Sequence, residues 1–130
     1  MSRITILPAS LTPWLHAALR VVAGLLYLEH GTSKLLGFPH DAHYDGLQLV
    51  SFMGLAGVLE MVGGLLIVIG LFTRPVAFIL SGMMAVAYFM AHASRGFFPA
   101  LNGGDAAILF CFVFLYFAAA GPGPLSVDGE

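Results

Sequence analysis

Four long runs of apolar residues dominate the pattern along the chain, with polar or glycine- and proline-containing stretches between them. The runs cover residues 14–36, 49–72, 75–94 and 102–121, each close to the roughly 20 residues that a helix needs to cross a bilayer. Residues 106–120 are apolar without interruption, whereas the strands of a membrane barrel alternate apolar and polar residues. The pattern therefore predicts an all-α protein with four membrane-spanning helices.

The connections between the runs predict how the helices are arranged. Only residues 73 and 74 separate the second run from the third, which indicates a tight antiparallel hairpin, whereas residues 37–48 form the only long polar loop. Helices joined in this way are expected to pack as an antiparallel four-helix bundle. We therefore predict a single transmembrane domain over residues 1–130, with both termini on the same side.

The basic residues favour one orientation in the membrane. Four crossings put Arg3, Arg20 and Arg74 on the side of the termini, and Lys34 and Arg95 on the other side. Because cytoplasmic segments carry the excess of Lys and Arg, this distribution predicts cytoplasmic termini in a bacterial inner membrane.

The composition agrees with contact with a lipid bilayer and excludes several other classes. Hydrophobic residues make up 59% of the 130 residues and charged residues only 9%, too few to cover the surface of a small soluble domain. The formal net charge is −2 with five Lys and Arg residues, so no nucleic-acid partner is expected. Cys111 is the single cysteine, which rules out an internal disulfide.

Glu60 is a charged residue near the middle of the second run. At about 100° per residue of a helix, it shares a face with Ala56, Gly57 and Gly64. Small residues let another helix approach closely, so Glu60 is expected to point into the bundle as a protonated or shared carboxyl. Two interpretations stay open: a structural carboxyl that hydrogen-bonds a neighbouring helix, or a group used in proton or quinone chemistry.

Further ionisable residues are predicted to gather at one end of the helices, opposite the termini. Seven such side chains from all four predicted helices are expected there: Glu29, His30, Lys34, Glu60, His92, Arg95 and Asp105. They could form a hydrogen-bonded plug that fixes the register of the helices. Alternatively, they line a pocket for a polar head group such as a quinone ring, with histidine and carboxyl groups as proton partners.

The quinone interpretation assigns a role to each charged residue. The candidate catalytic residues, which would exchange protons, are Glu60, His92 and His30. The candidate ligand-binding residues are Arg20, Glu29, Lys34, Arg95 and Asp105. The cations of the second set would position anionic groups.

Metal and nucleotide cofactors are not expected. The sequence His40-Asp41-Ala42-His43, followed by Asp45, has a spacing that could hold a metal, but a loop rich in His and Asp is usually only solvated. Two histidines within the predicted spans, His30 and His92, could ligate a haem, although no second pair supports this. The chain contains no phosphate-binding loop, dinucleotide fingerprint or Cys-x-x-Cys motif.

A series of short motifs runs through nearly the whole chain. They are Leu19-Arg20-Val21, His30-Gly31, Lys34-Leu35 and Gly37-Phe38-Pro39, then Glu60, Gly63-Gly64-Leu65 and Gly70-Leu71-Phe72-Thr73-Arg74, and finally Gly121-Pro122-Gly123 and Ser126-Val127-Asp128. In their order and spacing they resemble the DoxX family.

This resemblance implies a four-helix integral membrane protein associated with oxidoreductases. Members of the family include the membrane subunit of a thiosulfate:quinone oxidoreductase, and others bring soluble antioxidant or sulfur-handling enzymes to the membrane. Asp105 stands where the family usually has Glu, and the chain has no fused second domain. Any electron donor would therefore be a partner chain.

We expect a small inner-membrane subunit of redox chemistry that interacts with quinone and with a partner oxidoreductase. The first alternative is a non-catalytic anchor or assembly factor for a soluble enzyme, and the second is a small solute or proton transporter. The glycine-rich helix faces also permit a homodimer.

Overall fold

The computed structural model describes residues 4–129, and these residues form helices with no strand among them. The four long helices are α1 (Thr12–Leu36), α2 (Phe52–Ile69), α3 (Thr73–Ala91) and α5 (Asp105–Ala120). The short elements are η1 (Ala9–Leu11), η2 (Ala42–Tyr44), η3 (Ala93–Arg95) and α4 (Pro99–Asn102). The prediction of an all-α fold is confirmed.

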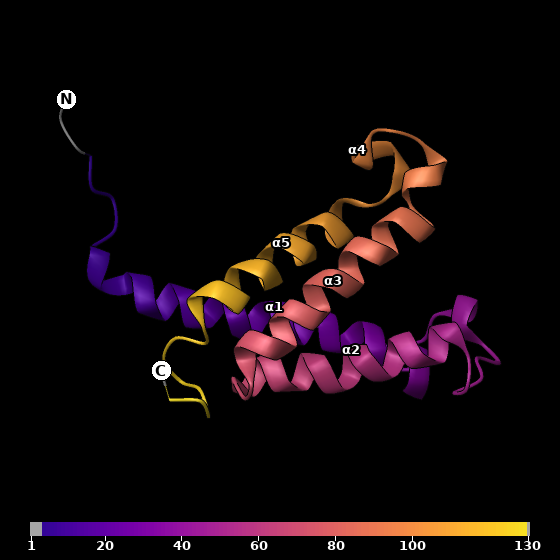
Figure 1. Cartoon of the computed structure of the whole chain (residues 1–130), viewed down its shortest axis with the longest axis horizontal. Coiled ribbons are helices and arrows are strands. Elements are labelled where there is room, and N and C mark those ends of the chain that lie inside the picture. The colour runs from indigo at the N-terminus through magenta and orange to yellow at the C-terminus, as the bar shows by residue number, and fades with distance from the viewer. Residues whose placement is uncertain (1–3, 130) are drawn as a thin grey trace.

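The long helices are arranged as two antiparallel pairs (Figure 1). α1 packs along α2, and α3 packs along α5, with fewer contacts between the pairs. The pairs cross near the turn at residues 70–72 and the tail at residues 121–128, which we call the closed end. They diverge toward the connections at residues 37–51 and 92–104, which we call the open end. The antiparallel four-helix bundle that we expected is therefore confirmed only within each of the two pairs.

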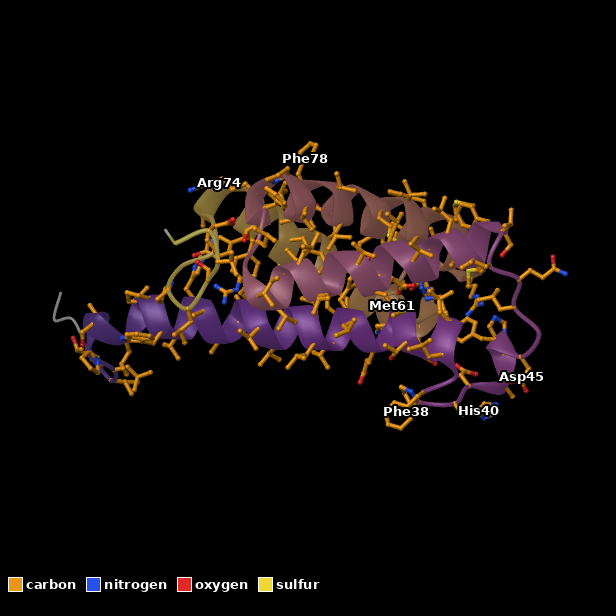
Figure 2. The ribbon with its side chains drawn as sticks, turned by 90° about the horizontal axis from the view of Figure 1, so that it is seen from below. Phe38, His40, Asp45, Met61, Arg74 and Phe78 are labelled. Carbon is orange, nitrogen blue, oxygen red and sulfur yellow. The ribbon has the colours of Figure 1, made fainter. Side chains whose placement is uncertain are left out.

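Glycines bring α1 and α2 together. A Cβ atom at Gly31 would lie 2.6 Å from the backbone nitrogen of Met61, and one at Gly64 would lie 2.8 Å from that of Leu28. Figure 2 shows Met61 at the seam between the two helices. These glycine faces cover one another within one chain. They are therefore not exposed surfaces through which two copies could form the homodimer that the sequence permits.

The apolar core lies where the two pairs cross. Tyr27 from α1, Ile67 from α2, Leu80 from α3, and Phe114 and Phe117 from α5 are all buried there. Tyr27 and Phe114 meet edge to face, with ring centroids 5.0 Å apart. Toward the open end the helices separate, and the core gives way to a cavity.

The helix boundaries shift from the predicted ones for local reasons. α1 starts two residues before the predicted residue 14 because Pro13 is tolerated in its first turn. α2 is shorter than the predicted 49–72, since the hydroxyl of Ser51 caps it by accepting the N–H of Gly54 at 3.0 Å. It ends where Gly70 takes a left-handed conformation with φ 70°.

The last two predicted helices differ more. α3 begins at Thr73 rather than at residue 75 and gives way to η3 after Ala91. Of the predicted helix 102–121, residues Asp105–Ala120 form α5, whereas Asn102 ends the short helix α4, because Gly103 between them is left-handed with φ 76°. α5 itself has 16 residues.

Within residues 4–129, three helical segments are long and apolar enough to cross a membrane: Ala9–Leu36, Phe52–Ile69 and Thr73–Arg95. α5 is a shorter apolar helix. Large apolar side chains cover the outside of these segments, and Figure 2 shows one of them, Phe78, pointing away from α3. α5 therefore falls short of the length that the other three segments reach.

Candidate functional site

A cavity of about 540 Å³ lies between the two helix pairs on the open-end side of the core. α1, α2, α3 and α5 all contribute to its wall, together with Tyr44 from η2. Most of the lining is aliphatic, aromatic or methionine side chains, and Met53, Met83, Met84 and Met90 are among them. Such a mostly apolar cavity with few polar groups is typical of small-molecule sites.

An ion pair forms the polar wall of this cavity. The ammonium of Lys34 donates to Oε1 of Glu60 at 2.6 Å, and both side chains are less than a tenth exposed. The ammonium also lies over the ring of Tyr44, 5.1 Å from its centroid. Glu60 therefore points inward, as predicted, and shares its charge with Lys34.

The close approach of α1 and α2 makes this ion pair possible. A Cβ at Gly57, one turn before Glu60, would lie 3.2 Å from Cβ of Lys34. A larger residue there would push the base of Lys34 away from α2. The same glycine that shares a face with Glu60 in the sequence thus leaves room for the partner of Glu60.

His30 and Tyr27 line the cavity one and two turns before Lys34, respectively. Tyr27 is 1% exposed, and its hydroxyl donates to the sulfur of Met83 at 3.0 Å. His30 faces the ring of Phe110, with centroids 6.3 Å apart. Tyr27 is not among the predicted site residues, although it lies seven residues before Lys34 and so falls on the same helix face.

His92 lines the cavity from the end of α3. Its Nδ1 lies 3.2 Å from the backbone oxygen of Asn102. A carbonyl oxygen can only accept, so Nδ1 carries the proton in this bond. Nε2 of a neutral His92 is then an acceptor, which suits a group that takes up a proton.

Asn102 is a second residue of structural importance near the cavity that is not among the predicted site residues. It is 2% exposed, and its amide nitrogen donates to the backbone oxygen of Gly96 at 2.9 Å and to the hydroxyl of Tyr88 at 3.1 Å. Its amide oxygen accepts the N–H of Gly104 at 2.8 Å. Asn102 thus holds the connection that carries His92. The feature of the sequence that could have indicated this role is a single amide residue followed by two glycines, Gly103 and Gly104.

Three other candidate residues lie outside the cavity. Glu29, Arg95 and Asp105 are exposed and do not contribute to its lining. Of the seven ionisable side chains expected at this end, the structure brings together His30, Lys34, Glu60 and His92. The separation of the helix pairs leaves the remaining three on the outer surface.

Arg20 lies at the closed end, away from the cavity. Its guanidinium is fully buried and donates only to backbone oxygens in its hydrogen bonds. The acceptors are Ile67 at 3.1 Å, Val68 at 3.5 Å, Pro122, Pro124 at 3.1 Å and Leu125 at 2.6 Å. The role expected for Arg20, holding an anionic ligand group, is therefore not what its surroundings support. It satisfies the carbonyls at the end of α2 and in the tail.

The tail is bound to the turn between α2 and α3. The backbone N–H of Asp128 donates to the oxygen of Gly70 at 2.9 Å. The carboxylate of Asp128 accepts the N–H groups of Phe72 and Thr73, each at 2.9 Å, and so caps α3. The bond from the Thr73 N–H is the main cause that lowers the pKa of Asp128 below its ordinary value. Figure 2 shows Arg74 at this end, opposite Asp45.

The polar loop at the open end contains an exposed ion pair between His40 and Asp45. Nε2 of His40 lies 2.9 Å from Oδ1 of Asp45, and both side chains are mostly exposed. Within residues 4–129 no group of three or more His, Cys, Asp or Glu side chains could hold a metal ion. The metal interpretation of this loop has no support in its geometry.

Apolar helices of membrane-spanning length, with an ion pair inside a cavity between them, define a small helical membrane protein. The chain belongs to the DoxX family, whose sequence model matches residues 15–93. The match covers α1, α2 and α3 and with them all four ionisable residues of the cavity. The resemblance seen in the sequence is thereby confirmed.

Two relatives extend this assignment. A Haemophilus influenzae protein described as "Uncharacterized protein" is 44% identical over 127 residues, which cover 91% of each chain. The Bacillus subtilis protein named "Putative oxidoreductase CatD" is 38% identical over 60 residues, or 45% of each chain. No solved structure matches the chain.

Proposed function

We propose that this protein is a membrane subunit that binds quinone in the cavity between the helix pairs and works with a partner oxidoreductase. The observation that carries the proposal is the Lys34–Glu60 ion pair inside an otherwise apolar cavity. Charged groups inside a membrane protein are costly and usually serve a function. The name of the Bacillus subtilis relative supports a link to redox chemistry.

The cavity suits the chemistry of a quinone ring. Its volume of about 540 Å³ lies within the range of small-molecule sites. A quinone offers a flat apolar body with carbonyl oxygens that accept hydrogen bonds. The ammonium of Lys34, the ring of His30 and the hydroxyl of Tyr27 are donors among the lining residues.

Proton exchange is the work of the cavity's own side chains. Conversion of a quinone to a quinol takes up two electrons and two protons, and the electrons come from the partner oxidoreductase. Glu60 and His92 exchange the protons, with His30 nearer the surface. Lys34 holds the carboxylate of Glu60 in place and lowers the cost of its charge inside the membrane.

We place the protein in a bacterial inner membrane with four crossings and cytoplasmic termini. α5 makes the fourth crossing, because it is apolar after its first residue, Asp105, and packs antiparallel along α3. The distribution of Lys and Arg supports the orientation. Residues outside the cavity, including the exposed connections, are available to the partner.

Binding of a short-chain quinone to the purified protein in nanodiscs tests the proposal. Glu60→Gln keeps the shape of the side chain and removes its charge, and we expect it to weaken binding at least about tenfold, or about 1.4 kcal/mol. Glu29→Gln is the matched control, because Glu29 lies on the exposed side of α1 and does not line the cavity. It should bind like the wild type.

A double variant separates loss of binding from loss of folding. Lys34→Met/Glu60→Leu replaces the buried pair by apolar residues, a change that is often neutral for stability. We expect it to elute as the wild type does and to lose quinone binding. Equal quinone affinity in the wild type, Glu60→Gln and the double variant would reject the cavity as the site. Absence of binding in the wild type would favour the membrane-anchor alternative.

A further inference from the structure

The cavity between the helix pairs has an apolar side that opens between α2 and α3. A side chain that lines a cavity and also reaches the molecular surface marks a place where the cavity is open. Five large apolar residues of α2 and α3 do both: Phe52, Leu55, Leu59, Val86 and Met90. We call the gap that these five residues border the lateral mouth.

The divergence of α2 and α3 accounts for the mouth. The two helices separate from their turn at residues 70–72 toward the open end (Figure 1). Near the turn they still pack closely, because a Cβ at Gly63 would lie 2.7 Å from Cδ2 of Leu80. Farther along, the small side chains of Ala56 and Ala87 face the cavity and leave the space between the helices unfilled.

The lateral mouth faces acyl chains rather than water. Leu55 and Leu59 lie in the apolar segment Phe52–Ile69, and Val86 and Met90 lie in Thr73–Arg95, two of the segments long enough to cross a membrane. Residues 52–59 and 83–90 contain no charged side chain. Exposed apolar side chains within a membrane-spanning segment contact lipid. This placement does not depend on whether α5 makes a fourth crossing.

The other sides of the cavity have a different character. Between α1 and α5, the exposed His30 faces the ring of Phe110 with centroids 6.3 Å apart. Toward the open end the lining is polar, with the ammonium of Lys34 over the ring of Tyr44 and the imidazole of His92. The cavity is thus polar at its inner wall and open end and apolar at its mouth, which suits a ligand with a polar head and a hydrocarbon tail.

We propose that the ligand is a quinone with a long hydrocarbon tail, which enters from the bilayer through the lateral mouth and leaves its tail between α2 and α3. The proposal rests on the proposed function for the head group, which lies near Lys34 and Glu60. The tail passes Leu59 and Val86 into the surrounding lipid. Because acyl chains are about as apolar as this rim, the mouth has only to let the tail pass, not to bind it tightly.

Two quinones with the same ring, one with a decyl tail and one without a tail, test this arrangement in nanodiscs. Leu59→Trp and Val86→Trp each place a bulky side chain in the mouth, from opposite helices. Leu65→Trp is the matched control, because Leu65 is an exposed residue of α2 that does not line the cavity. We expect both mouth variants to weaken binding of the decyl quinone at least about tenfold and to change that of the tailless quinone less than about twofold.

Comparison of variants with one quinone in the same nanodiscs cancels the partition of that quinone into the bilayer. Unchanged affinity for the decyl quinone in both mouth variants would overturn the proposal. An equal loss for the two quinones would also overturn it, because the mouth would then hold the head group rather than the tail. Loss of tailless-quinone binding in Glu60→Gln concerns the proposed function alone.

A measurement without quinone tests the mouth by itself. A phospholipid with a diazirine near the end of its acyl chain is irradiated in nanodiscs, and mass spectrometry locates its adducts. We expect adducts on Ala56 and Ala87 in the wild type and in Leu65→Trp, and their loss in Leu59→Trp. Their absence from the wild type would show that protein, such as a second copy of the chain, covers the mouth, and would overturn the proposal. Adducts without any quinone binding would overturn the quinone as ligand and leave the mouth open to lipid.

Discussion

The carboxylate of Asp128 is a single charge that holds two elements together. It accepts the backbone N–H groups of Phe72 and Thr73, and Arg20 adds a favourable charge nearby. These contacts, led by the Thr73 N–H, lower the pKa of Asp128 in the folded protein below its ordinary value of 3.8. The folded state therefore binds a proton at this group less readily than the unfolded state does.

The sign of the resulting pH dependence follows from linkage. Stability from Asp128 is fully present above the unfolded pKa and is lost as the pH falls through the lowered folded pKa. We expect the Tm of the wild type to exceed that of Asp128→Asn at pH 7, and the difference to shrink below about pH 4. Differential scanning fluorimetry of Trp14 emission in detergent measures both. Asp45→Asn, in the polar loop, is the control, and a pH-independent difference for Asp128→Asn would contradict this account.

Single residues also show how far the sequence predicts the candidate site. Glu60 could be found because an uncompensated charge in an apolar helix must point inward, and the structure supplies its partner. The same argument applied to Arg20 pointed to a ligand, but backbone carbonyls of the tail satisfy its guanidinium instead. No pattern in one sequence shows which backbone oxygens will meet a buried cation.

At the scale of elements, the α1–α2 contact depends on positions where the two backbones nearly touch. Gly31→Ala places a Cβ 2.6 Å from the nitrogen of Met61, so the helices must separate. We expect a loss of about 1–3 kcal/mol of stability, measured by thermal unfolding in detergent. Gly82→Ala in α3 is the matched control, since a Cβ there meets nothing within 4 Å.

The Gly82→Ala control separates the effect of packing on stability from the effect of helix propensity. Alanine is a better helix former than glycine by up to about 1 kcal/mol, so Gly82→Ala should leave the Tm unchanged or raise it. Because both replacements gain the same helix propensity, the difference between their effects on stability comes from the packing at Gly31. A loss of the same size in both variants would contradict the role of the close contact at Gly31.

The existence of the helices could be predicted from the sequence, but their pairing could not. Runs of apolar residues determine which segments leave water, and this identified all four long helices. Pairing depends on the register of glycines such as Gly57 and Gly64 against α1, which requires both helices in place. The start of α5 was predicted three residues early, because one left-handed glycine, Gly103, ends a helix without changing the hydropathy of the run.

For the molecule as a whole, the divergence of the two pairs creates the cavity, and filling it should abolish binding without harming the fold. Ala87→Leu adds volume at a lining position, whereas Ala85→Leu adds the same volume at a residue that does not line the cavity. We expect Ala87→Leu to weaken quinone binding at least about tenfold in nanodiscs. Equal affinities for the two variants would place the ligand elsewhere.

The tail at the closed end has a consequence for biosynthesis. Membrane helices enter the bilayer in the order of their translation, so the α1–α2 hairpin can pack through its glycines early, before α5 exists. The hydrogen bonds that tie the tail to the turn between the two pairs form only when Asp128 has been synthesised and reaches the N-terminus of α3. A chain that ends before Asp128 would contain every cavity residue. It would lack the hydrogen bonds of Asp128 that help to hold the two helix pairs, and so the cavity residues, at their spacing.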